Sequence, residues 1–239
     1  MLLLAVDTSG KNGSVALACT MPDQSQFDVL EVVPLEGGAF SAQLVPQIAA
    51  LLEKHGHSKN DLGAFAVGSG PGSFTGLRVG LAAIKALAEA LQKPIAAVSL
   101  LEVVACSSTA RGRVLAALDA GRGDVYAGDY DLDPQVHMRS ERLLSREEFL
   151  GEASLLEARF PEIPFAETKG KTVVTPDAGL AKMVRAAGIQ VEQVAYPNSG
   201  VIARLGWQHL QRGETVRPEE LVANYIRHSD AEIFSKPAS

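Results

Sequence analysis

The chain has 239 residues, of which 46% are hydrophobic and 21% charged, a composition typical of folded globular proteins that argues against disorder. Its 22 basic and 28 acidic residues give a formal net charge of −6, so the chain lacks the basic surplus with which proteins neutralise nucleic-acid phosphates. The two cysteines, Cys19 and Cys106, match no disulfide or zinc spacing, which predicts small packing roles in a reducing, cytoplasmic setting.

The first strand is predicted at residues 2–6, an apolar run that Asp7 interrupts before the core of a signal peptide could form. Residues 14–18 and 29–33 predict two further strands of a β-meander, with a turn at 9–13. The longest apolar segment, residues 77–91, contains charged residues and is shorter than the roughly 20 apolar residues that a bilayer crossing needs. We therefore expect no membrane span.

An amphipathic helix is predicted next, with Ser41 as its N-cap and Pro46 either in its first turn or at a bend. Its apolar stripe, at spacings i, i+4, i+7 and i+8, is Leu44, Ile48, Leu51 and Leu52. A strand at 62–67, a helix at 77–91 and a strand at 95–98 follow. This alternation after a meander predicts an α/β fold with a mixed sheet.

The pattern restarts near residue 107, where strands at 114–118 and 125–130 flank a turn at 119–123. A duplicated architecture is therefore predicted. Residues 132–171 carry the least information, and only a helix at 146–160 is expected there. The remaining predicted elements are a strand at 172–175, a helix at 177–187, a strand at 191–194, a helix at 201–211 and a helical segment at 218–226.

A glycine-rich segment, GSGPGSFTGLR at residues 68–78, precedes the second predicted helix. Free amides at a helix N-terminus suit an anion, but the spacing matches neither a dinucleotide fingerprint nor a phosphate-gripping loop. We expect the glycines to supply positive φ angles, and Ser73 or Thr75 to cap the helix.

Small residues at Gly76, at Gly80 and at Ala83 or Ala82 predict a groove along this helix. Small side chains at four-residue spacing let another helix approach closely. A partner's helix and a neighbouring helix of the same chain fit such a groove equally well.

The segments 68–99, LAVDTS at 4–9, LDA at 118–120 and DVY at 124–126 strongly resemble the TsaB (YeaZ) family, and GPGSFTGLR is highly specific to it. The resemblance is dense in the first half of the chain and patchy in the second. Two positions depart from the family pattern: Phe40 stands where relatives usually have His, and Ala223 where they usually have Pro.

The resemblance implies an α/β fold like that of actin and the Hsp70-like ATPases (ASKHA), with two related, ribonuclease H-like lobes whose mixed sheets are flanked by helices. We expect residues 1–106 to form the first lobe, residues 107–217 the second, and residues 218–239 to pack back on the first. The implied function is that of a non-catalytic dimerisation subunit for threonylcarbamoyladenosine modification of tRNA next to the anticodon. Its implied partners are the catalytic subunit TsaD and the ATPase TsaE, with a homodimer in their absence and tRNA contacted only through the complex.

The expected partner surface lies on the helices at 41–54 and 75–91. Its residues are Leu44, Ile48, Thr75, Gly76, Leu77, Val79, Gly80, Ala83, Ile84 and Leu87. Nucleotide-binding proteins of this fold carry two phosphate loops. We expect the loops at the corresponding positions of this chain to be vestigial; their residues are Asp7, Thr8, Ser9, Asp119 and Gly121. For Asp7, capping of its own turn is favoured over magnesium binding.

No metal site, cofactor or catalytic set is predicted, although a nucleotide between subunits stays open. The histidines lack the His-x-x-x-His spacing with which TsaD binds its metal, and His55 and His57 lack a third ligand. The alternative function is an ATP-dependent phosphotransferase of the same fold that uses Asp7 and the loop at 119–123.

Overall fold

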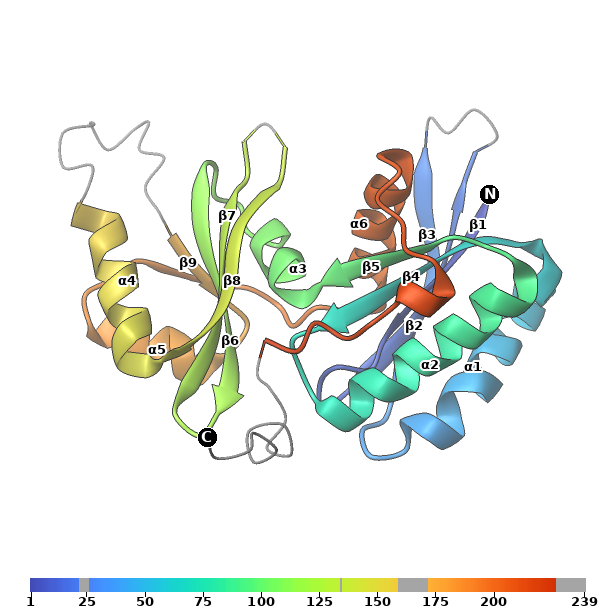
Figure 1. Cartoon of the computed structure of the whole chain (residues 1–239), viewed down its shortest axis with the longest axis horizontal. Helices are drawn as coiled ribbons and strands as arrows, with labels where there is room; N and C mark the ends of the chain where they lie inside the picture. The colour runs from blue at the N-terminus through green and yellow to red at the C-terminus, as the bar shows by residue number, and fades with distance from the viewer. Residues whose placement is uncertain (22–25, 134, 159–171, 227–239) are drawn as a thin grey trace, which may run out of the picture. The chain divides into compact units, whose positions relative to one another are not determined.

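The computed structural model describes residues 1–21, 26–133, 135–158 and 172–226. The chain divides into two compact units (Figure 1). Unit 1 comprises Met1–Val103 and Pro197–Asn224, and unit 2 is built around Val104–Tyr196. Each unit has its own five-stranded sheet and its own hydrophobic core.

The sheet of unit 1 has the strand order β3-β2-β1-β4-β5. Its first three strands, β1 (Leu2–Asp7), β2 (Gly13–Thr20) and β3 (Phe27–Leu35), form the predicted antiparallel meander. The next two, β4 (Leu62–Gly70) and β5 (Ile95–Ser99), continue the sheet in parallel with β1. The sheet is therefore mixed, as its sequence pattern predicts.

Helices cover both faces of this sheet. On one face, α1 (Phe40–Lys54) and α2 (Phe74–Leu91) pack on large side chains of the strands, such as Phe65. On the other face lies α6 (Ser199–Gln211), which contacts β1, β2, β4 and β5. A Cβ built on Gly206 would lie only 2.4 Å from the Cβ of Ala66, so α6 approaches the strands closely because both surfaces carry small residues.

The position of α6 corrects the predicted lobe boundary. Residues 107–217 are predicted as one lobe, but the chain returns to unit 1 at Pro197. The apolar residues of α6, including Ile202 and Leu205, are buried against the first sheet. Short-range sequence pattern cannot reveal this return, because it specifies which face of a helix is apolar and not which sheet receives that face.

Two shorter elements follow the first sheet and the last helix. Helix α3 (Leu100–Cys106), which follows β5, is absent from the sequence-based prediction. After α6, Val216 pairs with Ile95, and the 3-10 helix η2 (Pro218–Glu220) contacts α2. The helix predicted over 218–226 is thus reduced to a single short turn, because the residues after it run extended past β4, where the Asn224 amide donates to the Ser69 carbonyl at 2.7 Å. A further 3-10 turn, η1 (Lys59–Asp61), precedes β4.

The sheet of unit 2 repeats the topology of the first, with the order β10-β9-β6-β7-β8. Strands β6 (Arg113–Gly121), β7 (Asp124–Asp131) and β8 (His137–Ser145) form an antiparallel meander. Strands β9 (Thr172–Thr175) and β10 (Val191–Gln193) add to it in parallel. The predicted fold, two related lobes with mixed sheets flanked by helices, is confirmed.

Helices α4 (Arg146–Ala158) and α5 (Ala178–Ala186) cover one face of the second sheet. Phe149 of α4 and Leu180 of α5 are buried with Leu115 and Val125 of the strands. The predicted end of the first of these helices, at residue 160, lies outside the described residues.

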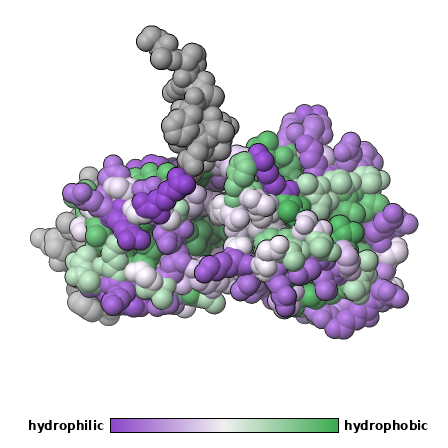
Figure 2. Space-filling view, turned by 90° about the horizontal axis from the view of Figure 1, so that it is seen from below, coloured by the Kyte–Doolittle hydropathy of each residue, from purple (hydrophilic) through white to green (hydrophobic). Residues whose placement is uncertain are grey.

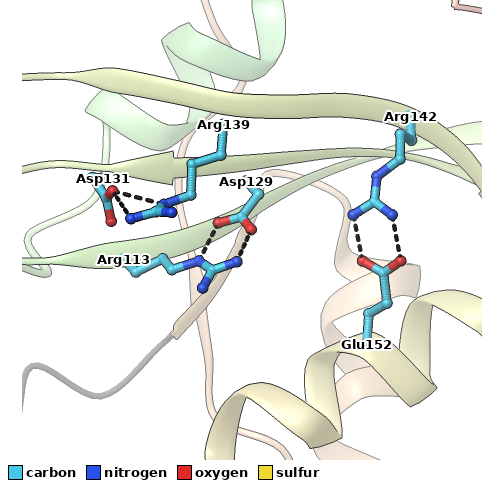
Figure 3. Close-up of polar contacts among 6 residues, drawn as sticks. All are labelled: Arg113, Asp129, Asp131, Arg139, Arg142 and Glu152. Carbon is cyan, nitrogen blue, oxygen red and sulfur yellow. Dashed lines mark hydrogen bonds and ion pairs between the residues drawn. The ribbon is translucent and has the colours of Figure 1, made fainter.

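Strand β8, which the sequence pattern does not predict, pairs antiparallel with β7, and charged side chains add contacts around it. Three ion pairs link the strands and α4: Arg113 with Asp129, Arg139 with Asp131, and Arg142 with Glu152 (Figure 3). The guanidinium of Arg142 donates two hydrogen bonds of 2.8 Å to Glu152, the planar geometry that favours an arginine–carboxylate pair. The charged residues that obscure the alternation in the sequence are thus paired in the structure.

Candidate functional site

An open groove of about 480 Å³ lies between α1 and α2 on unit 1. Arg78 is the one charged residue of its lining. The lining residues are Ser41, Leu44, Val45, Phe74, Thr75, Arg78, Val79, Ala82 and Ala83. Two of its large apolar side chains are well exposed, Val45 at 61% and Phe74 at 40%. Figure 2 shows hydrophobic surface, in green, between hydrophilic residues on the part of the molecule that carries these helices. Contiguous exposed apolar surface of this kind is typical of an interaction site.

The first turn of α2 shapes one end of the groove. Ser73 caps the helix, as predicted: its Oγ accepts the Gly76 N–H at 3.3 Å. The Ser73 amide in turn donates to the Ser9 carbonyl at 2.7 Å. One turn later, the Arg78 guanidinium lies 3.7 Å from the centroid of the Phe74 ring, a cation–π contact that orients both side chains at the groove.

Helix α1 starts earlier than the sequence predicts. Its first residue is Phe40, and Ala39 precedes it without a side-chain cap, so the prediction of Ser41 as the N-cap is wrong. Phe40 is 8% exposed and belongs to the core, so the helix begins with a residue whose ring is buried, two positions before the predicted start. Pro46 lies inside the helix and not in its first turn.

Gly76 and Gly80 do not form an open notch. A Cβ on Gly76 would lie 2.0 Å from the carbonyl oxygen of Thr8, and one on Gly80 would lie 2.4 Å from Thr8 Oγ1. The Thr8 hydroxyl donates to the Gly76 carbonyl at 2.7 Å. The prediction that these glycines receive a partner's helix is wrong, because Thr8 of the same chain, the residue after β1, fills the space.

The other predicted surface residues fall into two sets. Leu44, Ile48, Leu77 and Ile84 are at most 5% exposed and belong to the core of unit 1. The prediction that Ile48, Leu77 and Ile84 contact a partner is therefore wrong, whereas Leu44 also lines the groove. The remaining four lie on the accessible side of α2, with Thr75 exposed and Val79, Ala83 and Leu87 partly buried.

Sequence reasoning missed three groove residues, namely Val45, Phe74 and Arg78, whereas Ala82 is the predicted alternative to Ala83. The signal that could have found them is their position beside the buried stripe. An apolar residue outside that stripe, such as Val45, does not face the core of its own unit. Such a residue indicates that the helix has a second apolar face.

The Asp7-Thr8-Ser9 segment closes on itself at the end of β1. Asp7 Oδ1 accepts two hydrogen bonds, from the Ser9 amide at 2.9 Å and the Ser9 hydroxyl at 2.6 Å. Capping of its own turn by Asp7, the favoured prediction, is therefore confirmed. Burial raises the pKa of Asp7 above its ordinary value, and the two bonds from Ser9 oppose that shift.

The Asp119 loop of unit 2 is also bonded internally. Asp119 Oδ1 accepts the Gly121 amide at 3.1 Å, and the Asp119 amide donates to Asp177 Oδ2 at 2.8 Å. The Tyr196 hydroxyl donates to the other oxygen of Asp177. Desolvation, followed by the hydrogen bond to Asp177, raises the pKa of Tyr196. The loop thus joins the ends of β6 and β9 within this unit.

Among the residues that the structure describes, no three His, Cys, Asp or Glu side chains are grouped to hold a metal ion. His55 instead contacts Glu31, with Nε2 2.9 Å from Oε2. No helix in the described ranges is long and apolar enough to cross a bilayer.

Comparison with known proteins places the chain among its relatives. Residues 32–233 match a family model described as TsaD, tRNA N6-adenosine threonylcarbamoyltransferase. The chain is 36% identical over 136 residues to the tRNA threonylcarbamoyladenosine biosynthesis protein TsaB of Escherichia coli, and 28% identical over 205 residues to TsaB of Buchnera aphidicola. The chain belongs to the TsaB (YeaZ) family. The matched model also makes it a member of the wider TsaD-like family.

The alignments differ in extent. The Escherichia coli match covers 56% of this chain and 56% of the relative, and a Bacillus subtilis TsaB, 34% identical, is matched over 54% and 55%. The chain thus spans just over half the length of these two relatives. The Buchnera match covers 83% of this chain and 89% of the relative.

Two solved structures extend the likeness along both units. YeaZ from Pseudomonas aeruginosa has a TM-score of 0.69 and 26% identity, covering 93% of this chain and 100% of that one. A second structure is described as an uncharacterized protein from the same organism with similarity to peptidase YeaZ. It has a TM-score of 0.71 and 26% identity, and covers 95% of this chain and 99% of that one.

Proposed function

We propose that this TsaB-family chain is a non-catalytic scaffold subunit for threonylcarbamoyladenosine modification of tRNA next to the anticodon. It pairs with a catalytic TsaD-type subunit, works beside the ATPase TsaE, and contacts tRNA only through the complex. Family membership supports the pathway, since curated relatives are named as proteins of threonylcarbamoyladenosine biosynthesis. The observation that carries the scaffold role is the exposed apolar groove between α1 and α2.

The groove has the physical properties of a docking site. Its floor includes Leu44, which belongs to the core, so the two helices present the groove as a preformed shape. The side chains of Val45 and Phe74 stand exposed above this floor. Burying an apolar side chain of this size contributes about 1.5–3 kcal/mol, so a partner that covers both gains a substantial part of its binding energy here.

The loops expected to be vestigial also support a scaffold. The hydroxyl groups of Thr8 and Ser9 donate to Gly76 and Asp7 of the same chain. These two hydroxyl groups stabilise unit 1 through their hydrogen bonds, and they are therefore not available to bind a phosphate. In the corresponding loop of unit 2, Asp119 forms hydrogen bonds with Gly121 and Asp177 of the same chain.

A scaffold acts by changing the populations of its partner's conformations. Binding energy at the groove is coupled to the conformation of the TsaD-type subunit if that subunit binds more tightly in its competent state. The chain therefore raises the activity of its partner without contributing a reacting group.

The groove is tested by co-purification with the TsaD-type protein of the same cell. We expect the wild-type chain to elute with it as a complex whose mass is measured by light scattering. Val45→Asp, which places a charge in the groove, is expected to weaken association by about tenfold or more. Val222→Asp is the matched control, since Val222 is 71% exposed and lies outside the groove lining. Association of Val45→Asp at wild-type strength would reject the groove as the docking site.

The phosphotransferase alternative is separated from the scaffold by calorimetry of the isolated chain with magnesium and ATP. A scaffold gives no binding heat. Tight binding that Asp7→Ala and Asp119→Ala both abolish would support the enzyme instead.

A further inference from the structure

The groove between α1 and α2 combines an apolar lining with a positive end. Its lining includes Val45 and Phe74, which are 61% and 40% exposed, and its one charged residue is Arg78. Phe74 is the first residue of α2, so the partial positive charge of a helix N-terminus lies at the same end of the groove as Arg78. A segment that carries acidic residues beside large apolar ones complements both parts of this lining.

The chain itself contains such a segment at residues 230–234, whose sequence is Asp-Ala-Glu-Ile-Phe. Ile233 and Phe234 are the large apolar residues of the sequence after Ile226, and Asp230 and Glu232 are its acidic residues. Residues 230–234, here named the acidic-apolar segment, lie outside the described residues. Their sequence matches the groove in charge and in apolar character.

The last described residues bring the chain close to the groove. The Asn224 amide donates to the Ser69 carbonyl at 2.7 Å, and the Asn224 carbonyl oxygen lies 3.1 Å from the position of a Cβ on Gly70. Gly70 precedes Phe74 by four residues, which span at most about 14 Å of chain. Residues 225–234 can span about 33 Å when extended. The acidic-apolar segment therefore reaches the groove from Asn224 with length to spare.

We propose that the acidic-apolar segment occupies the groove of its own chain and competes there with the TsaD-type partner. Its apolar pair, Ile233 and Phe234, covers the exposed side chains of Val45 and Phe74. A carboxylate of the segment faces Arg78 and the N-terminus of α2. The inference rests on the proposed function, because the segment is a competitor only if the partner docks in this groove.

A segment on the same chain competes effectively even when it binds weakly. A short flexible linker gives an attached group an effective concentration of about 1 mM. A segment that binds the groove with a Kd of about 0.1 mM then occupies it in about nine molecules of ten. The partner finds an open groove in only the remaining tenth, so its apparent affinity falls by about tenfold. Competition of this size adjusts assembly without preventing it.

Disulfide trapping in the full chain tests the occupancy without a partner. Val45→Cys combined with Phe234→Cys should form an intramolecular disulfide under mild oxidation, which peptide mapping distinguishes from any bond to Cys19 or Cys106. The matched control combines Phe234→Cys with Ala90→Cys, since Ala90 is exposed on the same helix but lies outside the groove lining. We expect trapping at position 45 to be at least tenfold faster than at position 90.

Two further measurements make the trapping result specific. Ala82→Cys, at an exposed position of the lining, repeats the experiment without changing Val45 and should also trap Phe234→Cys. A mixture of the single variants Val45→Cys and Phe234→Cys should give no linked pair of chains at low concentration, because the segment occupies its own groove. Circular-dichroism melting confirms that each variant is folded.

Competition is measured by the affinity of full-length variants for the TsaD-type protein. Ile233→Ser combined with Phe234→Ser removes the apolar pair and should strengthen association by about tenfold, because the groove is then open in every molecule. The matched control, Ser229→Ala combined with Ser235→Ala, changes two flanking residues without changing charge. It should associate like wild type.

The proposal is overturned if trapping is equally fast at positions 45 and 90, if the disulfide forms only between copies, or if removal of the apolar pair leaves the partner affinity unchanged. Failure of the proposed function gives a different result. Fast trapping at position 45 in a chain that forms no complex with the TsaD-type protein would retain the occupancy of the groove and reject both the scaffold role and the competition.

Discussion

Thr8 shows how one residue fixes the position of a whole helix. Its hydroxyl donates to the Gly76 carbonyl at 2.7 Å, and its atoms occupy the space that side chains at positions 76 and 80 would need. The two glycines are therefore required by close packing within the chain. Gly80→Arg would therefore separate α2 from β1.

Gly80→Ala is expected to lower the free energy of unfolding by about 1–3 kcal/mol, because its Cβ would lie 2.4 Å from Thr8 Oγ1. The matched control is Gly151→Ala in α4, where a Cβ meets nothing within 4 Å. There the alanine should stabilise the protein by about 0.4–1 kcal/mol, since it limits the unfolded chain and favours helix. Urea unfolding measures both, and equal stability of Gly80→Ala and wild type would refute the tight contact.

Asp7 predicts a stability that depends on pH. Because burial raises its pKa above the ordinary 3.8 of an aspartate, the folded state binds the proton more tightly than the unfolded state. Tighter proton binding stabilises the folded state. This stabilisation is complete below the pKa of Asp7 in the unfolded chain, and it is lost as the pH rises through the pKa in the folded protein. We expect Asp7→Asn, which still accepts the Ser9 bonds, to exceed wild type in free energy of unfolding at neutral pH. The difference should shrink as the pH falls toward 3.8.

Asp61→Asn is the control, because the pKa of Asp61 is shifted in the opposite direction to that of Asp7. Hydrogen bonds from the Ser58 amide and hydroxyl lower the pKa of Asp61, so its carboxylate stabilises the fold above its unfolded pKa and loses this effect in acid. Asp61→Asn should therefore be less stable than wild type at neutral pH. A stability difference for Asp7→Asn that does not change with pH would show that Asp7 titrates normally.

At the scale of elements, α2 serves two surfaces at once. One side of the helix, with Leu77 and Ile84, is buried on the sheet, and the other borders the groove. The segment after α6 packs against both the sheet and α2, because Val216 pairs with β5 and η2 contacts α2. Leu221, next to η2, is 6% exposed and joins the core.

Leu221→Ala should therefore lower the free energy of unfolding by about 2–3 kcal/mol, the cost of removing a buried leucine where neighbours relax only partly. Its chain neighbour Val222 is 71% exposed, so Val222→Ala should stay within about 0.5 kcal/mol of wild type. Denaturant unfolding of the two variants side by side makes the comparison. Equal stabilities would mean that the C-terminal segment is not part of the core.

At the scale of the whole molecule, the chain repeats one topology and carries an acidic balance. Both sheets place an antiparallel meander beside two parallel strands, in the same order. The net charge of −6 applies to the entire sequence. Nucleic-acid binding depends strongly on the phosphates that a protein neutralises.

The isolated chain is therefore expected to retain little tRNA in filter binding at moderate salt. Addition of the TsaD-type partner should raise the retained fraction, because the proposed function has tRNA contacted through the complex. Tight binding of tRNA by the chain alone that persists as salt is raised would contradict the proposal that partners hold the RNA.

Local pattern in the sequence was sufficient for most elements of the fold. Short apolar runs predict β1, β2 and β4, helical spacing predicts the buried stripe of α1, and Ser73 is recognisable as a cap. These features depend on residues a few positions apart, which the sequence displays directly. The restart of the strand pattern near residue 107 likewise predicts the duplicated sheet.

Only the tertiary structure decided which surfaces are filled. It placed α6 on the first sheet, Thr8 against Gly76 and Gly80, and Val45 and Phe74 in the lining of one open groove. Each of these contacts joins residues from different elements of the chain, and a small or apolar residue has the same sequence signature whether its neighbour is its own chain or a partner. Packing settles that difference, because two groups of atoms cannot occupy the same space.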